Sequence, residues 1–208
     1  MIDLSDGPLT CLITKGEVTS DRFSEFAQEI LCLLELSVEA AVSLIQIREK
    51  HITTGQLFTL ASEAAAVVSG SETKLIVNGR TDVALAAGAD GVHLPEDGMP
   101  VGAVRNICTA QCLIGASVHS LETATAARRE GADFVLFGPV FDSPGKSGVG
   151  LASLTNVCRT LDSFPVIAVG GINGSNYQSV LGNGARGFAA IRHLNDKNVL
   201  RELARTRT

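Results

Sequence analysis

The sequence has no apolar run that approaches the roughly 18 residues of a membrane-spanning helix. Residues 1–15 also lack the basic segment and the long apolar segment of a secretory signal peptide. Its 17 Lys and Arg are outnumbered by 22 Asp and Glu, so the net charge is −5 and gives no electrostatic reason to bind nucleic acid or an acidic membrane. These absences predict a cytoplasmic protein with no nucleic-acid or membrane partner.

Cysteine is also scarce, and its pattern excludes a disulfide framework. The five cysteines are odd in number and scattered, at Cys11, Cys32, Cys108, Cys112 and Cys158. They predict reduced thiols, as in the cytoplasm. Cys108 and Cys112 are four positions apart, but no cluster of His or further Cys lies beside them. We expect these two to be small buried residues rather than metal ligands.

What the chain does have is a recurring short apolar run, each followed by a helix-like stretch. Hydrophobic residues make up 45% of the 208 positions, enough for the core of a single domain over residues 1–208. The later runs are apolar without strict alternation, as expected of strands that helices cover on both faces. The predicted strands are Leu9–Thr14, Val42–Ile47, Lys74–Asn78, Gly91–Leu94, Leu113–Val118, Phe134–Phe137, Val166–Val169 and Phe188–Ile191.

Amphipathic segments lie between these strands, and Ser120 is expected to cap one of them. They are Gln56–Val68, Thr81–Ala87, Ser120–Glu130, Ser153–Leu161, Ser175–Leu181 and Asn195–Ala204. Three end in glycine just before a strand, at Gly88, Gly131 and Gly184, where a left-handed backbone is needed. The repeating unit favours the α/β class and a closed (β/α)8 TIM barrel. An open doubly wound sheet is the alternative, but the first strand lacks the Gly-rich turn of that fold.

In such a barrel the polar residues at the carboxyl ends of the strands point into the active site. The second strand ends Gln46-Ile47-Arg48-Glu49-Lys50. Alternation places Gln46, Arg48 and Lys50 on one face, where two cations and an amide suit a diphosphate. The alternative is a solvated strip in which the cations pair with Glu49.

The next two strand ends offer weaker signals. Asn78 fits a hydrogen bond to a heterocycle or phosphate, or equally a turn. His93 fits an acid–base group, although a packed barrel histidine is the more frequent case. Glu96 and Asp97 fit a Mg²⁺ site through carboxylate oxygens, or a simple acidic turn.

Ser117 and His119 alternate onto one face of the fifth strand. No base and orienting acid accompany Ser117, so we expect it to donate a hydrogen bond to substrate rather than to act as a nucleophile. His119 is expected to contact substrate or to cap the following helix.

The last three strand ends carry glycines and cations. Residues 138–150 form a Gly/Pro-rich loop that predicts a flexible lid bearing Lys146, with an ordinary mobile loop as the alternative. Gly170 and Gly171 follow the seventh strand, where such barrels commonly bind phosphate on backbone N–H groups. Ile191 and Arg192 end the eighth strand beside them.

The ordered sum of these segments resembles the thiamine phosphate synthase and TenI family over nearly the whole chain. The matching segments are 46–50, 75–78 with Arg80 and Asp82, 88–94, 117–122, 137–141 and 168–172. Synthases of this family join an aminopyrimidine methyl diphosphate to a thiazole phosphate and release diphosphate. The resemblance therefore implies two phosphorylated small molecules as partners, and it leaves open a homo-oligomer.

The resemblance also implies roles for individual residues. Catalytic roles fall to Arg48, Lys50 and Lys146, which would stabilise the leaving diphosphate, and to Ser117 beside the reacting groups. Gln46 and Asn78 would position the pyrimidine diphosphate. The remaining substrate-binding positions, including those that would hold the thiazole phosphate, are His119, Ser143, Gly145, Gly170, Gly171, Ile191 and Arg192.

Several positions depart from the family pattern. Gly79 and Gly98 stand where the family has two Mg²⁺-binding aspartates, which leaves Asp97 as the nearest candidate ligand. Gly145 replaces a hydroxyl residue and Arg192 replaces a serine. These losses favour two alternatives, a TenI-type thiazole phosphate tautomerase and a non-catalytic regulator that binds thiamine phosphates.

A tautomerase needs a residue that moves a proton, and here the resemblance gives no clear candidate. Pro139 occupies the position of the histidine that one such enzyme uses. His119 or His93 would then have to move the proton. The retained cations and Gln46 favour the synthase.

Overall fold

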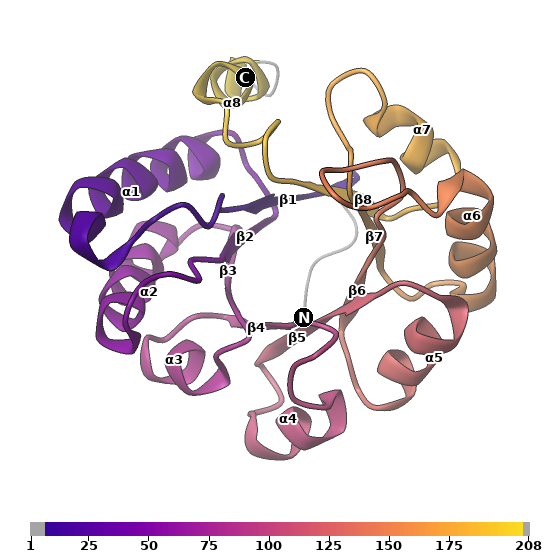
Figure 1. The fold of residues 1–208 in the computed structure, drawn as a ribbon, viewed down its shortest axis with the longest axis horizontal. Helices are drawn as coiled ribbons and strands as arrows, with labels where there is room; N and C mark the ends of the chain where they lie inside the picture. Colours follow the sequence, from indigo (N-terminus) through magenta and orange to yellow (C-terminus); the bar gives the residue numbers. More distant parts are fainter. Residues whose placement is uncertain (1–6, 206–208) are drawn as a thin grey trace. The chain divides into compact units, whose positions relative to one another are not determined.

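Eight parallel strands alternate with helices along residues 7–205, which are the residues that this computed structural model describes. The strands pair in chain order and close into a barrel, so the predicted (β/α)8 TIM-barrel fold is confirmed (Figure 1). They are β1 (Leu9–Ile13), β2 (Leu44–Ile47), β3 (Lys74–Asn78), β4 (Gly91–Leu94), β5 (Leu113–Val118), β6 (Phe134–Phe137), β7 (Val166–Val169) and β8 (Gly187–Ala190). Five of the eight have the predicted bounds; β1 and β2 differ by one or two residues at one end, and β8 by one residue at both ends.

The helices include two that the sequence reasoning missed, α1 (Phe23–Glu39) and α4 (Val101–Ile107). The buried positions of α1 include Ile30, Leu33 and Leu34, the spacing of an amphipathic helix, so the signal was present. The others are α2 (Thr54–Val68), α3 (Thr81–Ala86), α5 (Leu121–Arg129), α6 (Gly150–Leu161), α7 (Tyr177–Gly182) and α8 (Lys197–Arg205). A short 3₁₀ helix at Ser20–Arg22 precedes α1.

Local chemistry explains where the helices begin and end. The Ser120 side chain accepts a hydrogen bond from the N–H of Thr123 and caps α5, as predicted. The three predicted glycines after helices, Gly88, Gly131 and Gly184, all have positive φ, at 71°, 97° and 93°. Only glycine adopts this left-handed conformation without strain, so the chain turns there into the next strand.

Contacts within the chain gather into two units. Unit 1 contains the described residues 7–10 and 93–190, and unit 2 contains residues 11–92 and 191–205. The two strands β1 and β4 each begin in one unit and end in the other. The single domain over residues 1–208 stays a prediction.

Unit 2 contains the strand ends of β2 and β3 and the helices α1, α2, α3 and α8. The parallel register pairs Cys11 with Leu44, and Gln46 with Ile76. All four residues of β2 are buried, which fits a strand covered on both faces. Helices α1 and α2 lie side by side outside these strands (Figure 1).

Unit 1 contains β5 to β8 with α4 to α7, and its core is built around Phe134. A Cβ atom on Gly115 would lie 2.3 Å from the Phe134 ring, so glycine at this position makes room for the aromatic side chain. At the amino end of β6, Arg105 from α4 donates to the carbonyls of Gly131 and Cys112 and to the Asp133 carboxylate. This network fixes α4 against the loops that lead into β5 and β6.

Two general expectations from composition are met. All five cysteines are free. Burial raises the pKa of the Cys11 thiol to about 12 and that of Cys158 to about 11, so both are unreactive apolar residues at neutral pH.

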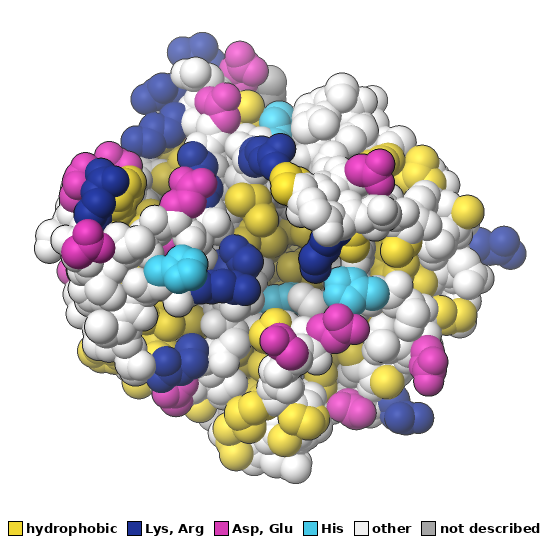
Figure 2. Space-filling view, viewed as in Figure 1, with side chains coloured by type: hydrophobic (Ala, Val, Ile, Leu, Met, Phe, Trp, Pro, Cys, Tyr) yellow, Lys and Arg dark blue, Asp and Glu magenta, His cyan; other side chains and the backbone are white. Residues whose placement is uncertain are grey.

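Within residues 7–205 no helix is long and apolar enough to cross a membrane. Figure 2 shows basic and acidic side chains interspersed around the edge of the face that it presents.

Candidate active site

The ends of β2 and β3 in unit 2 hold a buried amide pair. Gln46 is 1% exposed, and its Nε2 donates to Oδ1 of Asn78 at 2.8 Å. The other side-chain atom, Oε1 of Gln46, is buried and has no hydrogen-bond partner among the described residues. Buried acceptors are normally satisfied, so this oxygen is prepared for a donor that the protein itself does not supply. Asn78 is therefore more than a turn residue, because its hydrogen bond fixes the Gln46 amide with Oε1 as the atom that lacks a partner.

Arg48 follows at the end of β2 and is held by its backbone. Its N–H donates to Oγ1 of Thr14 at 2.8 Å, and its side chain is half-buried. A Cβ atom on Gly16 would lie 2.9 Å from a guanidinium nitrogen of Arg48, and Gly16 has a φ of 77°. Glycine therefore leaves the space that the guanidinium occupies. Of the described carboxylates, none forms an ion pair with Arg48.

Glu49 does not form the salt-bridge strip that was the alternative for this segment. The residue is 7% exposed, and its carboxylate accepts hydrogen bonds from the N–H groups of Gly16 and Val18, at 3.2 and 3.1 Å. Glu49 thus orders the loop after β1, and it leaves the neighbouring cations Arg48 and Lys50 without a carboxylate partner. The shared face of Gln46, Arg48 and Lys50 stays a prediction, because the guanidinium of Arg48 and the carboxylate of Glu49 both lie beside Gly16.

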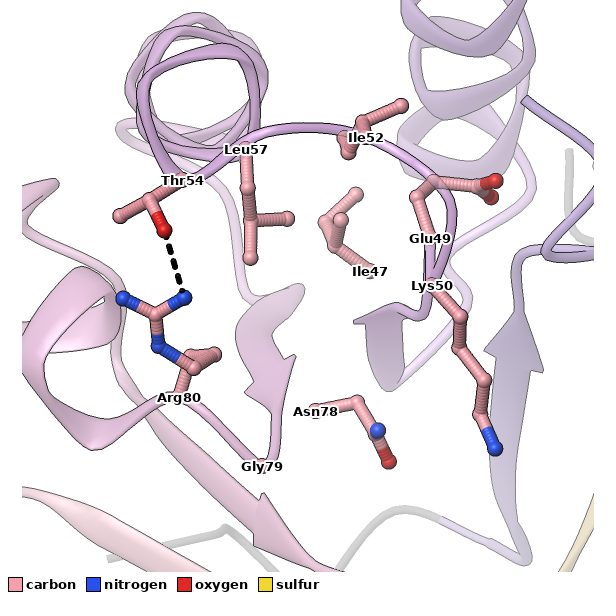
Figure 3. A pocket seen from close by; sticks show the side chains of 9 residues that line it. All are labelled: Ile47, Glu49, Lys50, Ile52, Thr54, Leu57, Asn78, Gly79 and Arg80. Atoms are coloured by element: carbon pink, nitrogen blue, oxygen red, sulfur yellow. Dashed lines mark hydrogen bonds between the residues drawn. The ribbon is translucent and has the colours of Figure 1, made fainter. Parts of the chain in front are cut away.

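A cavity of about 300 Å³ lies beside these strand ends. Figure 3 shows Lys50 and Asn78 extending to the same side, whereas Glu49 points the opposite way. Arg80 turns to Thr54 and forms a bidentate ion pair with Asp82. This pairing holds the pKa of the Asp82 carboxyl at about 2, so Arg80 is already neutralised. Lys50 is the cation lining this cavity that pairs with no described carboxylate.

The loop after β8 also belongs to unit 2. The strand ends at Ala190, one residue earlier than predicted, so Ile191 and Arg192 lie in the loop. Arg192 is exposed. The Nδ2 of Asn195 donates to the carbonyls of Ile13 and Ile191, and this fixes the loop against the end of β1.

Unit 1 contributes the ends of β4 to β7, and its best-defined contact joins two of the predicted residues. The Nε2 of His93 lies 2.8 Å from Oγ of Ser117. His93 is 2% exposed, which agrees with the packed barrel histidine, and burial lowers its pKa to about 3. Ser117 is half-buried, so its hydroxyl is partly accessible.

His119 does not cap helix α5 with its side chain. Its Nδ1 faces the carbonyl oxygen of Gly138, and its Nε2 lies 3.2 Å from Oε2 of Glu96. Both ring nitrogens therefore face acceptors. His119 links the end of β5 to the segments that follow β4 and β6, which is a positioning role.

The loop after β6 has more internal structure than the predicted flexible lid. Ser143 and Lys146 exchange two backbone hydrogen bonds, and Oδ1 of Asp142 accepts from the N–H of Gly148. Gly145 at the tip has a φ of 74°. Lys146 is exposed at the tip of this small hairpin, and no described carboxylate pairs with it. Movement of the loop stays a prediction.

Gly170 and Gly171 are required first by packing. A Cβ atom on Gly170 would lie 2.3 Å from the ring of Pro139, and one on Gly171 would lie 2.6 Å from the carbonyl oxygen of Asp142. Both have positive φ. The absence of side chains therefore lets the loop after β6 lie against the end of β7. The sequence reasoning expected these glycines for phosphate binding and missed this packing reason.

The described carboxylates near these strand ends are not grouped as a dedicated metal site. Asp82 is paired with Arg80, and Glu96 lies against His119. Asp97 is exposed. No group of three or more His, Cys, Asp or Glu side chains between residues 7 and 205 is arranged to hold a metal ion. The residues present do not fit Mg²⁺ bound by the protein through a dedicated carboxylate set.

The sequence reasoning missed the roles of three residues at these strand ends. Thr14, Glu49 and Asn195 organise the loops around Arg48 and Ile191 by hydrogen bonds. Thr14 offered a signal, because it is a polar residue that directly follows an apolar strand. Glu49 and Asn195 offered none that separates them from ordinary surface residues.

Comparison with known proteins places these strand ends in context. A family model described as thiamine monophosphate synthase matches residues 12–194. Thiamine-phosphate synthase of Caldanaerobacter subterraneus subsp. tengcongensis is 34% identical over 196 residues, which cover 89% of this chain and 92% of that protein. Thiamine-phosphate synthase of Methanoculleus marisnigri is 40% identical over 163 residues, which cover 76% and 77%. The structure of thiamine phosphate pyrophosphorylase from Pyrococcus furiosus has a TM-score of 0.80 at 28% identity and covers 98% of both chains.

Proposed function

Because the chain belongs to the thiamine monophosphate synthase family, we propose that it joins an aminopyrimidine methyl diphosphate to a thiazole phosphate. The product is thiamine phosphate, so the chain is a transferase of thiamine biosynthesis. The C–O bond of the pyrimidine methylene breaks, and its electron pair leaves with diphosphate. The lone pair of the thiazole nitrogen then forms the new C–N bond.

The observation that carries the assignment of residues is the unpaired guanidinium of Arg48. A half-buried cation without a carboxylate is costly to the free protein, and it becomes favourable when an anion binds. Arg48 and Lys50 are two positions apart at the end of β2, so they suit neighbouring oxygens of one diphosphate. Charge accumulates on that group as the C–O bond breaks, so both cations stabilise the transition state more than the ground state.

The pyrimidine ring is assigned to Gln46 and Asn78. Gln46 presents a buried Oε1 that lacks a donor, and an aminopyrimidine carries an N–H that supplies one. The hydrogen bond from Gln46 to Asn78 holds the amide in this orientation. Recognition through a fixed acceptor discriminates strongly against a ring that lacks the amino group.

Unit 1 supplies the remaining groups of the proposal. Lys146 at the hairpin tip adds a third cation for the leaving diphosphate, and Ser117 donates to a phosphate oxygen. Ser143, Gly145, Gly170 and Gly171 bind the thiazole phosphate, and Ile191 and Arg192 of unit 2 contact it. Through its contact with Gly138, His119 holds the start of the loop that carries Ser143, Gly145 and Lys146.

No step of the reaction is assigned to a metal held by the protein. The family's ligand positions are Gly79 and Gly98, and Asp97 belongs to no group of three or more potential metal ligands within residues 7–205. The three cations named above therefore supply the charge that acts on the diphosphate. A cytoplasmic location is also proposed, since the free cysteines suit a reducing compartment.

The test is a product assay with purified protein, the pyrimidine diphosphate and the thiazole phosphate, with and without Mg²⁺. We expect thiamine phosphate and diphosphate in equal amounts. A matched reaction with Arg48→Met protein checks that the product depends on the assigned site. No thiamine phosphate above background, with the thiazole phosphate converted to its tautomer, would instead assign the tautomerase activity. Binding of thiamine phosphate without either conversion would assign a regulator.

A further inference from the structure

The side chains of His93 and Ser117 form a hydrogen bond between neighbouring strands. His93 lies in β4 and Ser117 in β5, and Nε2 of the ring is 2.8 Å from the hydroxyl oxygen. The other ring nitrogen, Nδ1, is buried and has no hydrogen-bond partner in the described part of the chain. The ring packs near Phe134, with 6.5 Å between centroids. The ring thus has a hydrogen-bond partner at Nε2 and none among the described residues at Nδ1.

The charge state of the ring follows from its burial. Desolvation lowers the pKa of His93 to about 3, so the ring is neutral at pH 7. A neutral imidazole has one N–H donor and one lone-pair acceptor. The position of the proton therefore decides which of the two groups, His93 or Ser117, donates across the 2.8 Å contact.

The lack of a hydrogen-bond partner at Nδ1 decides which ring nitrogen carries the proton. A proton on Nδ1 leaves a buried N–H without an acceptor, and such orphaned donors are rare in folded proteins. A proton on Nε2 leaves only an unused lone pair at Nδ1, which costs less. The favoured tautomer therefore carries its proton on Nε2 and donates it to Oγ of Ser117.

We propose that His93 is a positioning residue that fixes the polarity of the Ser117 hydroxyl. With one lone pair of Oγ occupied by His93, the hydroxyl hydrogen is directed away from the ring. Ser117 then acts as a fixed donor to a phosphate oxygen of the substrate. The identity of the acceptor as a substrate phosphate rests on the proposed function, whereas the tautomer of His93 and the direction of its hydrogen bond do not.

If the hydrogen bond were reversed, so that Ser117 donated to Nε2 of His93, the same two side chains would form a nucleophilic pair. A histidine with a free lone pair at Nε2 accepts the serine proton and activates the hydroxyl as a nucleophile, usually with an acid on Nδ1 to orient the ring. No carboxylate of the described residues faces Nδ1 of His93. The arrangement therefore favours a binding donor over a nucleophilic serine.

The direct test is the tautomer, read from long-range ¹H–¹⁵N spectra of ¹⁵N-labelled wild-type protein at pH 7 without substrate. We expect a pyrrole-type nitrogen at Nε2 and a pyridine-type nitrogen at Nδ1, with no change down to pH 5. The spectrum of Ser117→Ala protein identifies the signals, because only the ring that loses its partner shifts. A proton on Nδ1, or a doubly protonated ring at pH 7, overturns the proposal.

Kinetics supply the second test, with a matched pair of variants. His93→Gln keeps an N–H near the position of Nε2 and is expected to retain most of kcat/KM, whereas His93→Leu is expected to lose about tenfold. In the Ser117→Ala background, His93→Leu is expected to cause no further loss, because the two residues act as one unit. Additive losses contradict action through Ser117. If the wild-type protein makes no thiamine phosphate, the proposed function fails, while the tautomer measurement still decides this inference.

Discussion

Two half-buried arginines of this chain, Arg105 and Arg48, have opposite surroundings. The guanidinium of Arg105 makes four hydrogen bonds, two to Gly131, one to Cys112 and one to Asp133, with distances of 2.6 to 3.0 Å. The guanidinium of Arg48 pairs with no carboxylate between residues 7 and 205. A satisfied cation at the amino ends of strands stabilises the fold, whereas an unsatisfied cation at the carboxyl ends is available to a ligand.

The largest effect is expected for Arg48→Met. The change removes the cation that faces the leaving diphosphate, so we expect kcat/KM for thiamine phosphate formation to fall by about 100-fold or more. The free energy of unfolding is expected to stay the same or to rise slightly, because no ion pair is lost. Steady-state kinetics and urea denaturation measure the two quantities on the same preparation.

The matched control for Arg48→Met is Arg48→Lys, which restores a point charge without the two-oxygen fork. We expect it to recover part of the lost activity. If Arg48→Met loses stability and keeps its activity, the contrast between the two arginines is wrong.

The second prediction is the reverse outcome for Arg105→Met. This change removes the Arg105 donors from the carbonyls of Gly131 and Cys112, and it leaves the Asp133 carboxylate with only the N–H of Ile114, so the free energy of unfolding is expected to fall by about 2 kcal/mol. Activity per folded molecule is expected to be unchanged at low temperature. Thermal or urea unfolding, with activity corrected for the folded fraction, measures both.

This comparison also marks how far the sequence could predict the molecule. Strand periodicity and the glycines after helices were sufficient for the barrel, because both are local signals with a physical cause. The same reasoning placed Arg48 at a strand end but could not see that Glu49 binds the amides of Gly16 and Val18. That contact spans more than 30 positions, so no local pattern reports it.

The glycines of the seventh strand end illustrate a second limit. Gly170 and Gly171 were expected for phosphate, yet their lack of side chains is already required by Pro139 and Asp142. A glycine in the sequence shows that space or a left-handed backbone is needed, but it does not name the neighbour. Only the packing of the loop after β6 supplies that neighbour.

The third prediction extends the comparison to a buried group that titrates. Burial lowers the pKa of His93 from about 6.5 to about 3, so the unfolded chain binds a proton before the folded protein does as pH falls. Stability from this group is therefore greatest above pH 6.5 and falls as pH drops toward 3. At pH 5.5 the expected loss is about 1.4 kcal/mol relative to pH 8.

The measurement is the difference in unfolding free energy between wild type and His93→Gln across pH 5 to 8. Taking the difference removes the contribution of the carboxylates, such as Asp82, which titrate at lower pH. The gap between the two proteins is expected to shift in favour of the variant as pH falls. A gap that is independent of pH is incompatible with a neutral buried His93.

The smallest effect is expected for Lys146→Ala, and it separates the hairpin cation from the strand-end cation. Lys146 is exposed at the tip of its loop, so water and salt screen its charge more than that of Arg48. We expect kcat to fall by about fivefold with little change in KM, because charge develops on diphosphate only as the bond breaks. Initial rates at 50 and 300 mM salt, with Lys146→Arg as the control that keeps the charge, measure this. The loss is expected to be smaller at high salt. An equal effect on KM and kcat would argue that Lys146 contributes to ground-state binding, and a loss as large as that of Arg48→Met would remove the distinction between the two cations.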